Sequence, residues 1–183
     1  MKIKTLKIKN FRGYRGEISV NFDEFTALVG KHDIGKSSIM EALDVFFNDG
    51  KGIVKLDKED VNVGARANHE SEISITICFS ELPDRIVIDA TNETTLLGEH
   101  LLNEDGLLEI TKKYPNGGSA KVFIRAFHPT NPDCADLLLK KDSELRRIID
   151  AKQIPCADRA RNAVMRSAIW QYYNDSLRMS LID

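Results

Sequence analysis

The strongest indication of the fold is the stretch Phe25-Thr-Ala-Leu-Val-Gly30-Lys-His-Asp-Ile-Gly35-Lys-Ser-Ser38. Residues 30–37 match the pattern G-x-x-x-x-G-K-[ST], the apolar run at 25–29 predicts a strand before it, and a helical pattern begins at Lys36. Such a loop wraps backbone N–H groups around nucleotide phosphates. Its lysine reaches the β and γ phosphates, its hydroxyl (Ser37) helps to hold Mg²⁺, and the following helix points its positive end at the same anion. The sequence therefore predicts a nucleotide-binding protein.

Composition sets bounds rather than a function. The chain has 183 residues, 42% of them hydrophobic, which predicts one globular domain with a core and at most a small annex. The net charge of −2 does not indicate a nucleic-acid binder, but the first 16 residues carry basic side chains and no acidic one. We interpret the lysines among them as the solvated or edge face of a strand, which discourages pairing with other sheets. The alternative is a stripe that faces DNA; the basic residues are Lys2, Lys4, Lys7, Lys9, Arg12 and Arg15.

The three cysteines, Cys78, Cys134 and Cys156, are widely spaced and form no C-x-x-C pair. This spacing indicates neither a disulfide framework nor a zinc site. No signal peptide and no membrane-spanning apolar run is recognisable, so a reducing cytoplasm is the expected location.

Hydrophobic periodicity predicts the elements of the first half. We expect strands at 2–9 and 17–22 around a turn at 10–13, and a helix that begins at Ser37 and ends near Asn48. The helix is predicted to bury one apolar stripe, formed by Ile39, Met40, Leu43, Phe46 and Phe47. Residues 51–70 are predicted to be an irregular loop, and 73–79 an amphipathic strand.

The second half contains a clear hairpin. Residues 107–114 and 121–127 flank Pro115-Asn-Gly-Gly118, a strong turn signal. We further expect a short strand at 85–89, a short helix at 95–102, a loop at 128–132, a helix at 143–152 and another from Asp158, with a stripe of Met165, Ile169 and Tyr172.

The order of these elements narrows the class of P-loop protein. Small kinases and GTPases usually open on the P-loop strand, whereas here two strands precede it and antiparallel strands follow its helix. The guanine-reading sequence N-K-x-D does not occur, which argues against a GTPase. A compact P-loop kinase stays an alternative.

The residues also carry a family resemblance. The run Lys7-Ile-Lys-Asn-Phe-Arg-Gly-Tyr14, the loop ending Asp33-Ile-Gly-Lys-Ser37 and the helix start Ile39-Met-Glu-Ala-Leu43 resemble the N-terminal part of ABC-type ATPase heads. These heads occur in RecF, SMC and overcoming-lysogenisation-defect (OLD) proteins, and the chain is most similar to the OLD type. The resemblance covers about residues 1–47. It implies an α/β P-loop NTPase fold of the ABC/RecF/SMC head type, with an ATP-binding lobe and antiparallel β subdomain at 1–127 and a helical arm or dimerisation insert at 128–183.

The resemblance also implies the site. ATP and Mg²⁺ are the expected cofactors, Lys36 the catalytic residue and Ser37 the metal-binding residue. Arg12 matches a position that touches the phosphates, and its alternative is an exposed arginine of the turn. His32 stands where the family often has Asn; it is expected either to face solvent or to make ATP affinity depend on pH. The residues expected at the phosphates are Arg12, Gly30, Lys31, His32, Asp33, Ile34, Gly35, Lys36, Ser37 and Ser38.

Other parts of an ABC-type head are missing from the sequence. No Walker-B strand ending in Asp-Glu, no signature motif and no switch histidine is recognisable. Asp89 ends a short apolar strand, but Ala90 replaces the second acid, so we interpret Asp89 as a strand-end aspartate rather than a magnesium ligand. Gln153 is the candidate for the γ-phosphate-sensing glutamine.

The C-terminal helices carry two further features. Their arginines are interpreted as exposed and balanced by nearby acids, with a DNA surface as the alternative. Trp170, Tyr172 and Tyr173 are interpreted as packing residues rather than a stacking platform. The arginines are Arg146, Arg147, Arg159, Arg161 and Arg166, with Arg159 and Arg166 expected on one helix face.

Together these features predict the ATP-binding part of a DNA-associated ATPase in anti-phage defence or repair. Hydrolysis is expected to require the missing segments and dimerisation of two heads, and a nuclease partner is possible. The alternatives are a non-hydrolysing module in which ATP controls assembly, or a small P-loop kinase.

Overall fold

The computed structural model describes residues 1–30, 35–89, 92–174 and 177–182. The chain divides into two compact units, which we call unit 1 (Met1–Ser80 and Glu109–Ile124) and unit 2 (Glu81–Leu108 and Arg125–Ile182). These units do not coincide with the expected division at residue 128, because residues 81–108 form part of unit 2. Among the described residues, no helix has both the length and the apolar composition needed to cross a bilayer.

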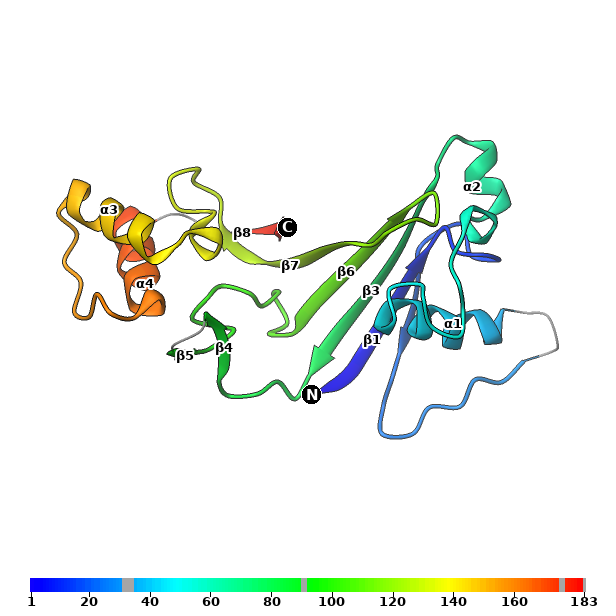
Figure 1. Ribbon diagram of the computed structural model, residues 1–183. Coiled ribbons are helices and arrows are strands. Elements are labelled where there is room, and N and C mark those ends of the chain that lie inside the picture. The colour runs from blue at the N-terminus through cyan, green and yellow to red at the C-terminus, as the bar shows by residue number, and fades with distance from the viewer. Residues whose placement is uncertain (31–34, 90–91, 175–176, 183) are drawn as a thin grey trace. The chain divides into compact units, whose positions relative to one another are not determined.

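The sheet of unit 1 is built around its first strand. β1 (Lys2–Lys9) pairs antiparallel with β2 (Ile18–Asn21) on one side and with β3 (Glu72–Ser80) on the other. The whole strand order is β2-β1-β3-β6-β7-β8, with β6 at Leu108–Pro115, β7 at Lys121–Pro129 and β8, a strand of unit 2, at Leu177–Ile182. Figure 1 shows β1, β3, β6 and β7 in this order. β1 is therefore an interior strand, so its lysines do not protect a sheet edge, but Lys2, Lys4 and Lys9 are exposed, as expected of a solvated face. Lys7 instead donates to the carboxylate of Glu109 at 2.9 Å.

β3 is buried on both faces rather than on one. Ile73, Ile75 and Ile77 have no exposed surface, as expected, but Thr76 and Cys78 on the opposite face are also buried. The hydroxyls of Thr76 and Thr111 lie 2.7 Å apart and satisfy each other. The alternation with Ser, Thr and Cys predicted that this second face would be solvated. The prediction failed because small polar side chains can be buried when they find such partners.

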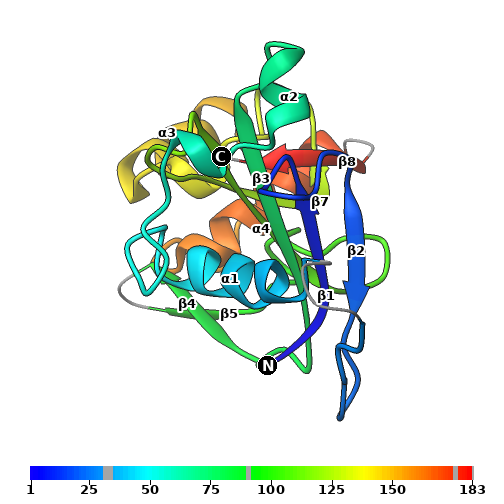
Figure 2. The ribbon, with the colours of Figure 1, turned by 90° about the vertical axis from the view of Figure 1, so that its right-hand side faces the viewer.

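Helix α1 (Lys36–Phe47) begins where predicted and ends at Asn48. Figure 2 shows it beside β1 and β3, and the rings of Phe46 and Phe79 lie 6.5 Å apart. The expected apolar stripe is partly wrong, since Met40 and Phe47 are 58% and 54% exposed. The buried positions of the helix are Ile39, Ala42, Val45 and Phe46.

The expected strand before the phosphate-binding loop is absent from the described residues. Residues 25–29 adopt no regular structure, and Phe25 and Val29 are 88% and 92% exposed. A strand needs a neighbour to pair its N–H and C=O groups, and no described strand pairs with this run. The apolar composition alone therefore predicted too much.

Residues 51–70 are more ordered than the expected loop. They contain the short helices η1 (Lys58–Asp60) and α2 (Val63–Ala67), capped by the side chains of Asp57 and Asn62. Asp60 accepts the backbone N–H of Arg12 at 2.7 Å, so this segment holds the turn that follows β1. The prediction failed because capping by Asp and Asn stabilises short helices that show little periodicity.

The β6–β7 turn is confirmed. Asn116 and Gly117 have φ values of 52° and 66°, the left-handed pair that a tight hairpin requires. A Cβ on Gly117 would lie 2.0 Å from the carbonyl oxygen of Asp57, so only glycine fits. The hairpin thus packs its backbone against the segment that bears Asp57.

Unit 2 combines a small ribbon with helices. β4 (Ile86–Asp89) pairs with β5 (Asn92–Thr94), and η2 (Leu137–Leu139), α3 (Asp142–Lys152) and α4 (Asn162–Tyr173) follow. The short helix expected at 95–102 is a series of turns, and β8 was not predicted. The expected loop at 128–132 begins with residues of β7.

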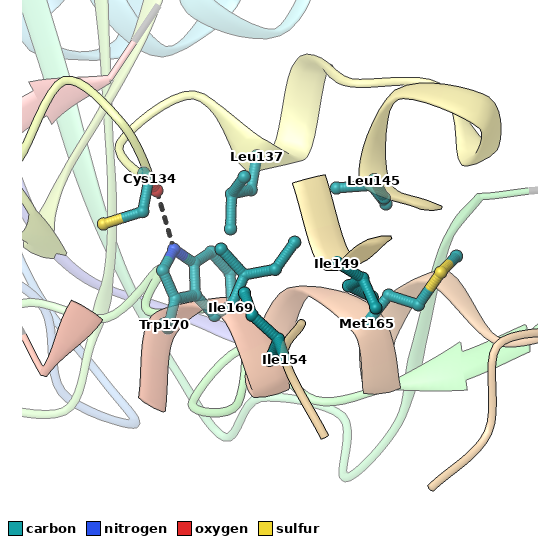
Figure 3. Packing of buried hydrophobic residues seen from close by; sticks show 8 residues of the cluster. All are labelled: Cys134, Leu137, Leu145, Ile149, Ile154, Met165, Ile169 and Trp170. Carbon is teal, nitrogen blue, oxygen red and sulfur yellow. Dashed lines mark hydrogen bonds between the residues drawn. The ribbon is translucent and has the colours of Figure 1, made fainter. Parts of the chain in front are cut away.

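The helices of unit 2 enclose one apolar cluster. Trp170 lies in it and donates its indole N–H to the carbonyl of Cys134 at 2.8 Å (Figure 3), which confirms its packing role. Tyr172 is 50% exposed, so it does not belong to the buried stripe. Helix α4 begins at Asn162, not at Asp158 as expected. The cluster consists of Cys134, Leu137, Leu145, Ile149, Ile154, Met165, Ile169 and Trp170.

Candidate phosphate-binding site

A polar pocket in unit 1 brings together the two sequence regions that carried the prediction. It has a volume of about 500 Å³ and is lined by the turn after β1 and by the start of α1. Among the expected site residues, the structure therefore places Arg12, Gly35, Ser37 and Ser38 at one pocket. Lys31, His32, Asp33 and Ile34 lie outside the described residues. The lining residues are Arg12, Gly13, Tyr14, Gly35, Ser37, Ser38 and Glu41.

The first turn of α1 is open to an anion. Its N-cap, Gly35, has φ 80° and supplies no side-chain hydrogen bond to the N–H groups of the turn. The hydroxyl of Tyr14 donates to the Gly35 carbonyl at 3.1 Å, and a Cβ on Gly35 would lie 2.8 Å from that hydroxyl. Glycine is thus required here, and the uncapped N–H groups are the donors that bind phosphates at helix N-termini.

Lys36 and Ser37 occupy the first two helical positions. The ammonium of Lys36 donates to the carbonyl of Gly30 at 2.6 Å, so the lysine lies across the two ends of the loop. Ser37 contributes its hydroxyl to the pocket. A hydroxyl, a lysine and the N–H groups of a helix N-terminus fit the triphosphate of ATP with hydrated Mg²⁺, which takes few protein ligands and keeps several waters.

Arg12 is held firmly at the rim of the pocket. Its φ is 48°, and the side-chain amide of Asn62 donates to its carbonyl. Its Nε donates to Asp60 at 2.9 Å and its Nη1 to Glu41. Burial lowers the pKa of Arg12, but the hydrogen bonds to Asp60 and Glu41 more than offset this, so the net shift is upward and the guanidinium stays charged.

Sequence reasoning missed Gly13, Tyr14 and Glu41, which line the pocket, and Asp60, which holds Arg12. A signal for Glu41 was available, because it follows Ser37 by four residues and Ser38 by three, which places it on the same helix face. No comparable signal existed for Asp60, since its position depends on the fold of residues 57–62.

The remaining candidates have structural partners in unit 2. The carboxylate of Asp89 contacts Arg166 at 3.0 Å, as a strand-end aspartate can, and Gln153 ends α3 with φ 53°. Arg166 is buried, so it cannot share an exposed face with Arg159. Arg146 and Arg159 pair with Asp142 and Asp150, as expected. The described residues contain no cluster of three or more metal-ligating side chains.

Comparison with known proteins places the chain in a family. A family model described as an AAA ATPase domain matches residues 1–180. The chain is 28% identical over 131 residues to Structural maintenance of chromosomes protein 1 of Caenorhabditis elegans. The aligned region covers 68% of this chain and 10% of that protein. The chain thus spans about a tenth of that relative's length.

A solved chain from work on ATP-driven dimerization and DNA-stimulated activation of SMC ATPases is 18% identical, with a TM-score of 0.45 over 67% of this chain and 68% of that one. The family match is the decisive finding, because it extends over nearly all of the sequence. The chain belongs to the AAA ATPase domain family, and part of it is similar in sequence to a structural maintenance of chromosomes protein.

Proposed function

We propose that unit 1 binds ATP with Mg²⁺ in the pocket at the start of α1, and that it is the nucleotide-binding lobe of a DNA-associated ATPase. The observation that carries this proposal is that the first turn of α1 contributes Ser37 and Ser38 to the same pocket as Arg12, from the turn after β1.

Each residue of the pocket has a distinct task. The N–H groups after Gly35 bind phosphate oxygens, and Lys36 exchanges the Gly30 carbonyl for the β and γ phosphates. Ser37 orients Mg²⁺, which neutralises phosphate charge when it is bound. Arg12 adds a second positive charge at the rim. The chain's own residues thus bind and position the phosphates.

Hydrolysis requires more than this pocket supplies. Glu41 is the only carboxylate that lines it among the described residues, and Glu41 is paired with Arg12. Asp89, the other acid that we considered, is engaged by Arg166 in unit 2. Because catalysis of phosphoryl transfer depends on groups around the γ-phosphate, we expect the chain alone to bind ATP and to hydrolyse it slowly.

The exposed run at 25–29 supports completion of the lobe by further polypeptide. Phe25 and Val29 are almost fully exposed just before the loop, and the run has no strand partner in the described chain. A second polypeptide segment pairing with this run would bury both side chains and bring in the missing acid. Two heads would then enclose ATP between them.

The wider role is proposed from resemblance. An OLD-type ATPase in the cytoplasm, acting on DNA in anti-phage defence or repair with a possible nuclease partner, is consistent with the similarity to a chromosome-maintenance protein. A non-hydrolysing assembly module is the alternative, supported by the pairing of Glu41, the one carboxylate among the described residues that line the pocket, with Arg12. A compact kinase would need a carboxylate available for catalysis within the chain.

The test is a calorimetric titration of the chain with Mg·ATP, with phosphate release followed in parallel. We expect binding with little turnover, and a loss of affinity of about tenfold or more in Lys36→Ala, since the lysine contacts two phosphates. Lys55→Ala, an exposed lysine of unit 1 outside the pocket, is the matched control and should bind normally. Brisk turnover by the chain alone would contradict the proposal and favour the kinase alternative.

A further inference from the structure

We propose that Glu41 competes with the nucleotide phosphates for Arg12, so that ATP binding transfers the guanidinium from Glu41 to phosphate while Asp60 keeps it tethered. This inference rests on the proposed function of the pocket. It assigns positioning roles to two carboxylates, neither of which was among the site residues expected from the sequence.

The geometry divides the guanidinium between two elements. Glu41, on α1, takes Nη1, whereas Asp60, in the segment before α2, takes Nε at 2.9 Å. A guanidinium carries five N–H donors. The bonds to Asp60 and Glu41 use two of them, so three N–H donors of Arg12 remain for a further partner. Arg12 can therefore accept a new partner before it gives up an old one.

The two carboxylates differ in how readily Arg12 can break its contact with them. The side chain of Glu41 is 30% exposed and lines the pocket, whereas that of Asp60 is 15% exposed and does not line it. Water can solvate Glu41 once Arg12 departs, which makes that contact the cheaper one to break. Asp60 also fixes the backbone, because its carbonyl accepts the N–H of Arg12.

Charge favours the exchange. A phosphate at the first turn of α1 would share the pocket with the Glu41 carboxylate, and like charges in one site repel. Arg12 neutralises Glu41 in the nucleotide-free protein through Nη1 alone, whereas a phosphate offers several oxygens and can form a bidentate pair with the guanidinium. Glu41 consequently lowers the affinity for ATP by holding a cation that the phosphates would otherwise use.

The test compares Mg·ATP dissociation constants of the full chain and its variants. Glu41→Gln keeps the shape of the side chain and removes its charge, so we expect binding about three- to tenfold tighter. In an Arg12→Gln background there is no guanidinium left to release, so any remaining gain measures only the repulsion between Glu41 and the phosphates, and we expect it to be smaller than the gain in the parent chain. Asp60→Asn should weaken binding, since the tether of Arg12 is lost.

Glu59→Gln is the matched control. It removes the same charge from unit 1, at an exposed side chain that pairs with Arg66 outside the pocket, and should leave affinity unchanged. A merely structural role for Glu41 would give weaker binding on substitution, so a gain of affinity is diagnostic.

Three results would overturn the inference. If Glu41→Gln gains equally with and without Arg12, Glu41 acts by repulsion alone. If Glu41→Gln shows no gain in affinity for Mg·ATP, while the parent chain binds Mg·ATP and Lys36→Ala does not bind it, the competition is refuted and the proposed function stands. If the folded parent chain does not bind Mg·ATP at all, both fail.

Discussion

Arg12 in unit 1 and Arg166 in unit 2 each contact two carboxylates, but they differ in exposure. Arg12 bridges Asp60 and Glu41 with a side chain that is 32% exposed at the rim of a pocket. Arg166 makes a two-pronged contact with Glu99 at 2.8 and 2.7 Å and a third with Asp89, and its side chain is only 2% exposed.

The difference separates a structural charge cluster from an exchangeable one. Glu99 has 1% of its side chain exposed and also accepts the hydroxyl of Thr94, so neither water nor a ligand can replace Arg166. Burial lowers the pKa of Arg166, but Glu99 and then Asp89 reverse this and give a net upward shift. Arg12 shows the same balance of causes at a site that a ligand can reach. Exposure, not the number of ion pairs, indicates which arginine can change partners.

The largest expected effect is at Arg166. Arg166→Met leaves Glu99 buried without its cation and should lower the free energy of unfolding by about 3–5 kcal/mol, measured by urea denaturation. The double variant Arg166→Met with Glu99→Leu should recover most of that loss, because the remaining carboxylate, Asp89, has 22% of its side chain exposed and can be solvated. Arg146→Gln, which breaks an exposed pair with Asp142, is the control and should cost less than about 1 kcal/mol. A loss at Arg166 as small as at Arg146 would contradict the comparison.

A smaller effect is expected at Gly117, which supports the segment that holds Arg12. Gly117→Ala combines an unfavourable φ with a clash against the Asp57 carbonyl, and should cost about 2–4 kcal/mol in urea denaturation. Gly106→Ala is matched in φ, at 70°, but a Cβ there meets nothing within 4 Å. It should cost only about 1–2 kcal/mol. Equal losses would show that the close approach to Asp57 has no energetic role.

Arg12 itself should matter less for stability than for binding. Arg12→Gln breaks two partly exposed ion pairs, and both carboxylates regain water, so we expect a loss of about 1 kcal/mol in unfolding free energy. Thermal and urea denaturation measure this directly. A loss as large as that of Arg166→Met would mean that Arg12 is a structural residue, and the contrast between the two sites would disappear.

The smallest effect is a pH dependence in unit 2. Burial, and then the charge of His128, lower the pKa of His100, and Glu99 opposes this only in part. The unfolded chain therefore binds a proton at His100 more readily than the folded chain does, so stability is lost as pH falls below about 6.5, the ordinary value for histidine. His100→Asn, which tolerates the φ of 55° at this position, should flatten the decline between pH 7 and 5. Identical pH profiles for the two proteins would refute this assignment.

The sequence predicted the elements whose signals are local. β1, β2, the start of α1 and the turn at Asn116-Gly117 follow from periodicity, from the loop motif and from residues that accept positive φ. The Arg12 turn was found by resemblance, and Arg12 lines the same pocket as Ser37 and Ser38; that this pocket binds phosphate stays a prediction.

The errors concern residues whose environment depends on distant partners. The apolar run at 25–29 has no strand beside it in the described chain, and Met40 and Phe47 remain exposed because nothing described covers that part of α1. Arg166 reads as a surface residue in an amphipathic helix, yet Glu99, 67 positions earlier in the chain, makes its burial possible. No local pattern predicts such a pairing.

The most direct test of the account maps the nucleotide onto the chain by NMR. Amide shifts of the labelled chain are recorded as Mg·ATP is added, with Lys36→Ala as the reference. We predict that the changes centre on Gly30, Gly35, Ser37 and Ser38 and extend to Arg12, and that they vanish in the variant. Changes centred instead on the pocket of unit 2 lined by Gly98, His100, Ser167 and Gln171, or unaffected by loss of Lys36, would contradict the assignment of the α1 pocket as the ATP site.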